Sequence, residues 1–213
     1  NALPLSYIGI YLFLVMFLSI TLIYRVVGEI TLERGSARSF TTELDKAIPF
    51  VPQMAVFYLS LYLGFWTIPI IFQEISYAYF TKIVLATFIA FFFCSIIYMI
   101  IPSTYNNREI IVGGNFFAQT LVRNGIYKYD LPNNTIPSTH AALATILLLA
   151  TAKKFNFWFF LRYLLWGIAI ITSTLLIKQH HIIDVLTGIF TGWISLYLSN
   201  VCCKNYYSPK NPR

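Results

Sequence analysis

All three histidines of this 213-residue chain lie in two short segments, each at the edge of a long apolar run. The first segment runs from Pro137 to His140, and the second runs from Lys178 to Asp184. Ionisable groups at membrane depth are costly, and they tend to mark functional sites. We therefore expect the chemistry of this protein to lie in these two segments.

His180 and Asp184 are four residues apart, so in a helix they would share one face. A carboxylate in that place accepts a hydrogen bond from one ring nitrogen, fixes the tautomer and leaves the other nitrogen basic. The spacing predicts a basic or nucleophilic His180 that is oriented by Asp184. The alternative is a polar pair that only stabilises the end of a helix.

The first segment has the features of a helix start. Pro137 suits a first turn, and Ser138 or Thr139 can cap it. The free backbone N–H groups at such a start, together with the helix dipole, form an anion site. His140 lies just inside and is placed to give a proton to a leaving group. The alternative is an ordinary capped helix with a histidine at the membrane interface.

Two basic residues are predicted on the same side of the membrane as both histidines, namely Arg108 and Lys178. A helix start, two cations and hydroxyl groups around two histidines describe a site for a phosphate dianion and its transition state. For either cation alone, contact with lipid headgroups is the alternative interpretation.

The composition indicates a membrane protein, because 58% of the residues are hydrophobic and only 11% are charged. Most of its six apolar stretches approach the ~20 residues that a helix needs to cross the hydrocarbon core. The stretches are Leu3–Tyr24, Phe50–Phe72, Phe80–Ile101, Pro137–Ala152, Phe155–Ile177 and His181–Cys202. We predict an all-α, polytopic membrane protein: a six-helix bundle, one domain over residues 1–213, with its active site at one membrane face. The first stretch lacks a positively charged leader, which favours a true span over a signal peptide.

Three polar loops of this bundle, Arg25–Pro49, Pro102–Ile136 and Lys178–His180, should fall on one side of the membrane. Basic residues are nearly balanced between the two sides, with a slight preference for cytoplasmic termini. The net charge of +7 is interpreted as contact with lipid headgroups. We expect no nucleic-acid partner, because no basic run with interleaved aromatic residues is present.

The order and spacing of these residues resemble the type-2 phosphatidic-acid phosphatase superfamily. Its three motifs are Lys-x6-Arg-Pro, Pro-Ser-Gly-His and Ser-Arg-x5-His-x3-Asp. Arg108, Pro137–His140 and Ser173–Asp184 correspond to them in order. The resemblance covers roughly Asp45 to Gly192, which is most of the chain.

Two further segments, Asp45–Pro52 and Tyr129–Asn133, are similar to the branch that contains inositol-phosphorylceramide-synthase-like proteins. The chain departs from the superfamily motifs at four positions. Ile101 stands where the first motif has lysine, Glu109 replaces its proline, Thr139 replaces glycine, and Thr174 replaces arginine. The branch resemblance implies that Lys178 substitutes for the missing cations.

The resemblance implies metal-independent hydrolysis of a phosphate ester or anhydride on a membrane lipid, without a cofactor. In that mechanism His180 attacks phosphorus and becomes a phosphohistidine, Asp184 holds its ring, and His140 protonates the leaving group. The groups that would neutralise the phosphoryl oxygens are Arg108, Lys178, Ser138 and Thr139. His181 is expected to be structural or to contact headgroups. The resemblance also implies a periplasm-facing site at the inner membrane if the source is a bacterium, which is the location we expect, and a lumenal site if it is a eukaryote.

Three other functions stay open at this point. The same histidine could pass the phosphoryl or phospho-headgroup to an alcohol, which would make the protein a lipid phosphotransferase. A metal or haem site using His140, His180 and Asp184 is disfavoured, because no span contains a glutamate and the nearby cations would repel a metal ion. A transporter or scaffold that has kept the family fold is the third alternative, since two of the family's cations are replaced.

Overall fold

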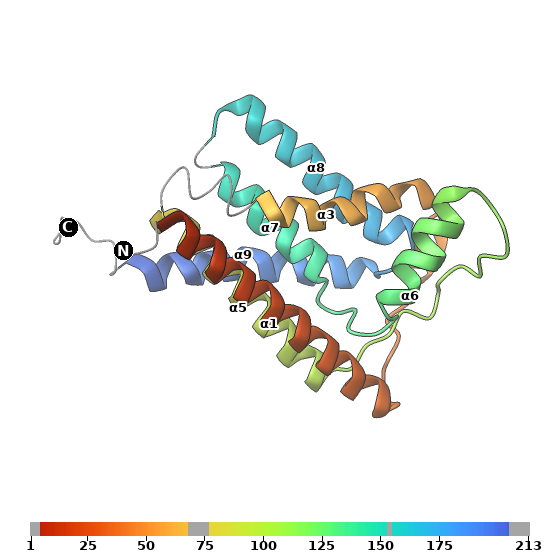
Figure 1. The fold of residues 1–213 in the computed structure, drawn as a ribbon. Coiled ribbons are helices and arrows are strands. Elements are labelled where there is room, and N and C mark those ends of the chain that lie inside the picture. Colours follow the sequence, from red (N-terminus) through yellow and green to blue (C-terminus); the bar gives the residue numbers. More distant parts are fainter. Residues whose placement is uncertain (1–4, 68–76, 153–154, 205–213) are drawn as a thin grey trace.

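The computed structural model describes residues 5–67, 77–152 and 155–204. Within these ranges the chain is helical, and the only β-type pairings are two isolated bridges between loops. The all-α class is therefore confirmed for the described residues (Figure 1). The elements are α1 (Leu5–Glu33), α2 (Glu43–Ala47), the short turn η1 (Pro52–Met54), α3 (Ala55–Thr67), α5 (Tyr77–Ile100), the π-helical segment η3 (Phe117–Ile126), α6 (Tyr127–Tyr129), α7 (Thr139–Ala152), α8 (Phe157–Leu176) and α9 (Ile182–Lys204).

Four of the six predicted spans are confirmed as helices that are long and apolar enough to cross a membrane. They are Phe13–Glu33, Ala78–Ile100, Phe157–Leu176 and Ile182–Cys203. The predicted fourth span forms α7, which is a shorter apolar helix. The predicted second span forms α3 as far as Thr67, and the rest of it lies outside the described residues.

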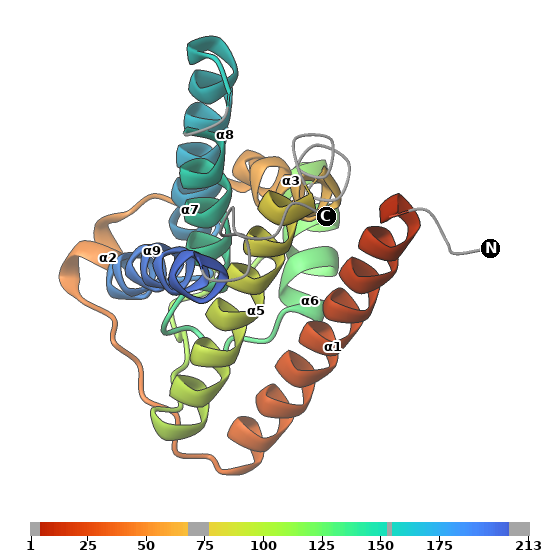
Figure 2. The same ribbon diagram turned by 90° about the vertical axis from the view of Figure 1, so that its left-hand side faces the viewer.

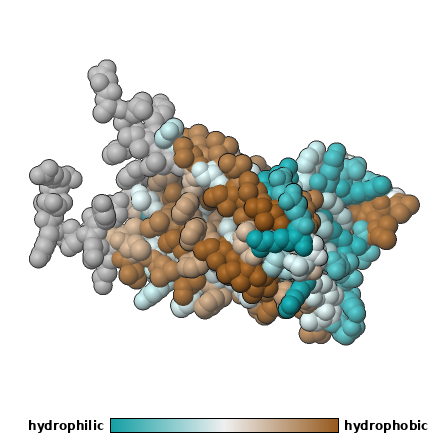
Figure 3. Space-filling model, turned by 90° about the horizontal axis from the view of Figure 1, so that it is seen from below, coloured by the Kyte–Doolittle hydropathy of each residue, from teal (hydrophilic) through white to brown (hydrophobic). Residues whose placement is uncertain are grey.

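The outer surface of the long helices is apolar. Exposed large side chains on this surface include Leu18, Leu22, Leu63, Leu165, Phe190 and Trp193. Figure 3 shows this surface in brown, with hydrophilic residues gathered at one end of the molecule. An apolar surface of this extent is unfavourable in water, so it fits a lipid environment, in which helices satisfy their own backbone hydrogen bonds.

Helix α7 forms the core of the bundle. Ten of its 14 residues are buried, and Figure 2 shows it among α5, α8 and α9. Its Ile146 and Leu147 belong to one apolar cluster with Phe13 of α1, Ile83 of α5 and Ile170 of α8. The helix that carries His140 is therefore fixed by packing against most of its neighbours.

Two glycines allow α7 and α9 to approach closely. A Cβ atom on Gly188 would lie 2.4 Å from the carbonyl oxygen of Ser138, and one on Gly192 would lie 2.3 Å from that of Ala142. Both distances are shorter than any normal contact, so only glycine fits. Small residues four apart are a common device for close contact between membrane helices. Here they bring the first turn of α7 against the start of α9.

The three polar loops meet at one end of the bundle, as predicted. The backbone N–H of Arg38 donates to the Pro102 carbonyl at 2.9 Å, and the Lys178 ammonium donates to the Asp45 carbonyl at 3.1 Å. In Figure 1 these loops gather at the end of the molecule where α6 lies. The bundle thus places all its candidate site residues at a single face.

Candidate active site

Ser138 caps α7 and ties it to α9. Its Oγ accepts from the Ala141 N–H at 3.3 Å, and its own N–H donates to the carbonyl oxygen of Asp184 at 2.9 Å. The predicted role of Ser138 as a cap is confirmed. Through this contact, the helix starts that carry His140 and Asp184 lie side by side.

His180 lies before α9 and not inside it, so the predicted shared helix face is wrong. The helix begins at Ile182, after a turn in which Lys178 has a positive φ of 57°. The reason lies in Asp184, whose Oδ2 accepts from the backbone N–H of His181 at 2.8 Å. A carboxylate at the third helical position that binds the N-cap N–H defines a helix start. His180 and Asp184 still approach each other, with 3.5 Å between Nδ1 and Oδ2.

The nearer partner of His180 is the backbone carbonyl of Thr135, 3.1 Å from Nδ1. A carbonyl oxygen can only accept, so Nδ1 carries the hydrogen and Nε2 holds a lone pair. No hydrogen bond occupies Nε2 in the described part of the chain. The ring is therefore held in the tautomer that a nucleophilic or basic imidazole requires.

His181 is fully engaged in the fold. Its Nδ1 lies 3.0 Å from Asp184 Oδ2, and its Nε2 lies 3.0 Å from the Thr41 hydroxyl. The side chain is entirely buried and packs on the ring of Tyr105. These contacts fit the expected structural role.

His140 lies close to His180 and has no polar partner among the residues that the structure describes. The two ring centroids are 6.0 Å apart, and neither nitrogen of His140 makes a hydrogen bond to any described residue. The ring stacks on Tyr58 of α3, with 4.1 Å between centroids, and is only 7% exposed. A buried polar group without a partner is unusual and calls for an explanation. A ligand bound between the two histidines would supply one.

Arg108 is bound to α6 and to the loop that follows it. Its guanidinium donates to the backbone carbonyls of Tyr127 at 3.3 Å and Asp130 at 2.6 Å, and it lies over the Tyr127 ring. Its Nε is buried without a partner among the described residues. Burial lowers the pKa of Arg108, the charge of Asp130 opposes this shift, and the group stays cationic.

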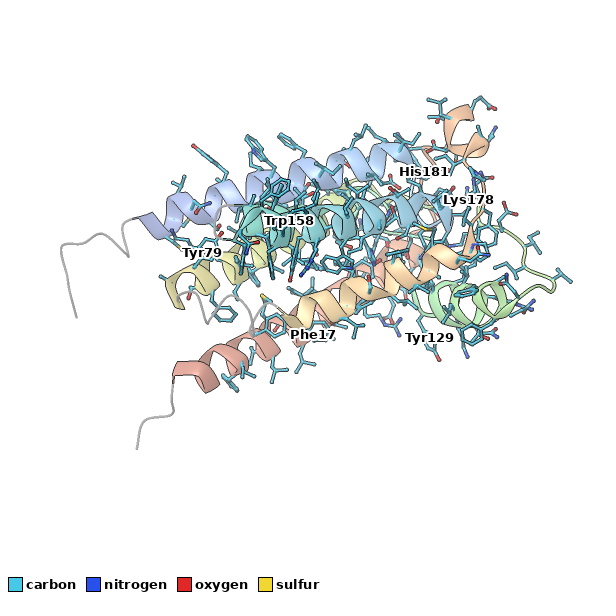
Figure 4. The ribbon with its side chains drawn as sticks, turned by 90° about the horizontal axis from the view of Figure 1, so that it is seen from above. Phe17, Tyr79, Tyr129, Trp158, Lys178 and His181 are labelled. Carbon is cyan, nitrogen blue, oxygen red and sulfur yellow. The ribbon has the colours of Figure 1, made fainter. Side chains whose placement is uncertain are left out.

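Lys178 points at the backbone of the first polar loop. Its ammonium donates to the carbonyls of Asp45, at 3.1 Å, and of Ile48. The residue is 2% exposed, and Figure 4 shows it beside His181 at the loop end of the molecule. The structure therefore places Lys178 next to the histidine segment but engages its charge with main-chain oxygens.

The carboxylate of Asp45 braces the same region from the other direction. Its Oδ1 accepts from the N–H of Ile182, the first residue of α9, and its Oδ2 accepts from Thr42. Burial raises the pKa of Asp45, but the hydrogen bonds from Thr42 and Ile182 outweigh it and lower the pKa overall. The first loop is thus part of the support for the second histidine segment.

The sequence prediction did not include Asp130 among the site residues. Its carboxylate accepts from the hydroxyls of Tyr24, at 3.0 Å, and Tyr58, and from the amide of Gln179 at 3.1 Å. These residues lie up to 106 positions away in the chain, so no local pattern indicates the cluster. The only signal was the resemblance of the segment around Asp130 to one branch of the superfamily.

A cavity of about 190 Å³ opens beside His140. Its polar end is formed by Tyr24, Tyr62, Asp130, Thr139 and His140. The rest of its wall is mostly apolar and comes from α1, α3, α5 and α7. The apolar wall residues are Phe17, Ile20, Leu61, Phe91 and Leu143. A ligand with a polar head and an apolar tail matches this division.

The described residues contain no group of three or more His, Cys, Asp or Glu side chains arranged to hold a metal ion. The two histidine segments instead combine one free imidazole nitrogen, a second unpartnered imidazole and a capped helix start. This combination suits nucleophilic and acid–base chemistry on an anion.

Searches of curated proteins and of solved structures gave no significant match. The family model described as the PAP2 superfamily matches residues 82–207, which is more than half of the chain. The matched part includes Arg108 and both histidine segments. Members of this superfamily are phosphatases and phosphotransferases that act on phosphate esters. As its motifs predicted, the chain belongs to the PAP2 superfamily.

Proposed function

We propose that this protein is an integral-membrane lipid phosphatase, which hydrolyses a phosphate ester or anhydride through a phosphohistidine at His180. The observation that carries the proposal is the state of the His180 ring. Its Nδ1 hydrogen is directed to the Thr135 carbonyl, which leaves Nε2 as the free nitrogen. The centroid of the His140 ring lies 6.0 Å from that of His180. One phosphoryl group between the rings would be within reach of both.

In the first step, Nε2 of His180 attacks phosphorus and forms a P–N bond. The P–O bond to the lipid breaks, and its electron pair goes to the leaving oxygen. His140, protonated at this stage, gives its proton to that oxygen. The phosphorylated His180 ring is positively charged, and the nearby carboxylate of Asp184 stabilises that charge.

In the second step, water attacks the phosphohistidine. His140 is now neutral and takes a proton from the water as the P–O bond forms. The P–N bond breaks, its electron pair returns to Nε2, and phosphate is released. The two steps leave both histidines as they began, and neither step requires a metal or a cofactor.

The negative charge on the phosphoryl oxygens needs compensation during both steps. We assign this role to the first turn of α7, with Ser138 and Thr139, and to Arg108 and Lys178. Both cations now donate to main-chain carbonyls. Lys178 would have to exchange its bonds to the loop for bonds to phosphate oxygens.

The substrate in this proposal is a phosphorylated membrane lipid. The cavity beside His140 supports this choice, because its wall is largely apolar and its polar end carries His140 and Thr139. The surrounding helices present an apolar surface that fits the bilayer. A lipid could thus place its headgroup between the histidines without leaving the membrane.

Transfer to an alcohol is the second candidate function, and the same cavity favours it. An acceptor that replaces water would have to lie where the leaving group lay, beside His140. A largely apolar cavity suits a lipid alcohol in that place. When candidate alcohols are supplied, a phosphomonoester of the alcohol would support transfer of a phosphoryl group, and a new phosphodiester lipid would support transfer of a phospho-headgroup. Release of phosphate alone would exclude transfer.

The proposed location is the inner membrane of a bacterium, with the loop end of the bundle facing the periplasm. This choice rests on the superfamily and on the weak charge asymmetry of the loops. A reporter fused after Arg213 tests it: cytoplasmic activity is expected, and an external C-terminus would overturn the orientation.

The central experiment is phosphate release from a panel of phospholipid, isoprenoid and glycolipid phosphates, measured in chelator. Wild type is compared with His180→Ala, and the folding of both is checked by thermal unfolding in detergent. Release by wild type alone, with a loss of at least ~1,000-fold in the variant, is expected. Equal release by a folded His180→Ala protein would exclude the phosphohistidine.

A further inference from the structure

Asp130 occupies a position that the mechanism above does not use. It lies at the polar end of the cavity, together with His140 and Thr139. Its carboxylate collects three hydrogen bonds, from Tyr24 of α1, Tyr58 of α3 and Gln179 beside His180. All three partners are hydrogen-bond donors, and a carboxylate is a pure acceptor that can take all three. The cluster therefore fixes the Asp130 carboxylate at the inner edge of the site.

Tyr58 links this charge to His140. Its hydroxyl donates to Asp130, while its ring stacks on the imidazole with 4.1 Å between centroids. Tyr62, one turn further along α3, meets the same imidazole edge-on with 6.1 Å between centroids. Ring contacts with Tyr58 and Tyr62 thus hold the imidazole in place, while both of its nitrogens stay free of hydrogen bonds to described residues.

In the proposed reaction, His140 must carry a positive charge at a buried position. It must be protonated before the first step, although it is buried in mostly apolar surroundings. A buried cation is costly unless a negative charge lies near it. The ionisable groups that face it from the surrounding elements are Tyr58 and Tyr62 of α3, Asp130 of the loop after α6, Tyr24 of α1 and His180 before α9.

Among these groups, Asp130 is the only carboxylate. Asp184, the other nearby carboxylate, is engaged with the two histidines of the second segment. We propose that Asp130 is a positioning residue for His140: its carboxylate stabilises the protonated imidazole, and its bond to Tyr58 holds the ring that stacks on it. This inference rests on the proposed function, in which His140 acts as the general acid.

The two histidines would then each have their own carboxylate. Asp184 stabilises the positive charge that the His180 ring carries after it has attacked phosphorus. Asp130 stabilises the positive charge that His140 carries before that attack. The positive charge thus moves from one side of the site to the other during the first step. A fixed negative charge on each side stabilises both states.

The test uses the leaving group to separate a role in acid catalysis from a role in folding. The alkoxide of an alkyl phosphate is a poor leaving group and needs a proton on its oxygen. The p-nitrophenolate of p-nitrophenyl phosphate leaves readily without one. For Asp130→Asn, we expect kcat/KM to fall by ~100-fold on a long-chain alkyl phosphate and by less than ~5-fold on the aryl phosphate, given the usual contribution of general acids. The alkaline limb of the alkyl profile should move to lower pH by about one unit, because the protonated imidazole has lost its counter-charge.

Two control variants retain a carboxylate at position 130. Tyr24→Phe removes one hydrogen bond to Asp130 without removing the carboxylate, and Asp130→Glu retains a carboxylate on a longer side chain. Both should keep the wild-type ratio of alkyl to aryl turnover within ~3-fold, because each preserves the negative charge on which the protonated imidazole depends. An equal loss on both substrates for Asp130→Asn, with an unmoved pH profile, would show a purely structural role and overturn the inference.

A second neutral variant, Asp130→Ser, repeats the test in case Asp130→Asn does not fold. If neither neutral variant folds while Asp130→Glu does, Asp130 is a structural residue and the inference is wrong. Failure of the proposed function looks different. In that case a folded His180→Ala protein releases phosphate as wild type does, whatever happens at Asp130.

Discussion

Asp184 and His181 are joined twice, because one carboxylate oxygen accepts both the backbone N–H of His181, at 2.8 Å, and its ring Nδ1–H, at 3.0 Å. This oxygen starts helix α9 and fixes a buried histidine at the same time. Its distance to His180 is longer, at 3.5 Å. The two adjacent histidines therefore differ: both ring nitrogens of His181 have hydrogen-bond partners, whereas Nε2 of His180 has none among the described residues.

Replacing each of these histidines with asparagine should separate the two roles. The asparagine amide can reproduce the Nδ1 donor but has no counterpart of Nε2. His180→Asn should keep the fold and lose at least ~1,000-fold in phosphate release. His181→Asn should instead lower the free energy of unfolding by ~1–3 kcal/mol, because the Thr41 hydroxyl loses its buried partner. Thermal unfolding and turnover on the same samples measure both, and a reversed pattern would contradict the assignment.

The close approach of α7 and α9 should tolerate no side chain at Gly188. A Cβ atom there would meet the Ser138 carbonyl and the Ala141 side chain, so Gly188→Ala must push the start of α7 away. We expect a loss of ~1–3 kcal/mol in stability and a fall in activity, since His140 moves with that turn. Gly167→Ala is the matched control.

Gly167 is also buried within a helix, but a Cβ atom there meets nothing within 4 Å among the described residues. Alanine at this position should raise stability by ~0.5–1 kcal/mol, because it reduces the freedom of the unfolded chain. Unfolding curves in detergent compare the two variants. Equal effects at both positions would show that contact with Ser138 is unimportant.

The pH dependence of stability should carry a contribution from Asp45. Its pKa is lower in the folded protein than in the unfolded chain, where it is ~3.9. Its stabilising effect is therefore complete above that value and disappears as the pH falls through the folded pKa. Wild type should lose thermal stability below about pH 4 more steeply than Asp45→Asn. Parallel melting curves from pH 6 to pH 2 would instead show that Asp45 contributes nothing.

Lys178 should affect both the fold and the binding of phosphate. In Lys178→Met the carbonyls of Asp45 and Ile48 lose a charged donor, which should cost ~1.5–3 kcal/mol. If the ammonium also moves to bound phosphate, inhibition by orthovanadate should weaken by ~10-fold or more. Reduced stability with unchanged vanadate inhibition would restrict Lys178 to the brace between the first loop and the second histidine segment.

Much of the fold could be predicted from the sequence, because long apolar runs leave few alternatives to membrane helices. The same holds for the meeting of the loops at one face and for the cap at Ser138, which depend on span order and on local propensity. The sequence placed the start of the last span at His181, one residue before α9 begins, but it did not predict the turn that takes His180 out of the helix. The positive φ of Lys178 and the double contact of Asp184 arise only in the folded turn.

The site was harder to predict wherever its contacts involve main-chain atoms or distant residues. Every residue has a carbonyl, so nothing in the sequence marks Thr135 as the partner of His180. Nor does the sequence show that the Lys178 ammonium donates to the main-chain carbonyls of Asp45 and Ile48. Asp130 gathers donors from α1, α3 and the turn before α9, and only the packing of the bundle brings them together.

The bond between His180 and the Thr135 carbonyl has a genetic consequence. Substitutions at position 135 leave a carbonyl in place, so a scan of that position would miss its contribution to the imidazole. The course of the main chain there depends instead on Ser103, whose hydroxyl accepts from the N–H groups of Thr135 and Ile136, both at 3.0 Å. It also depends on Asn134, which adopts a left-handed conformation with φ of 56°. Variation that disorients the His180 ring would therefore map to Ser103 and Asn134, which act on it through the main chain of residues 135 and 136.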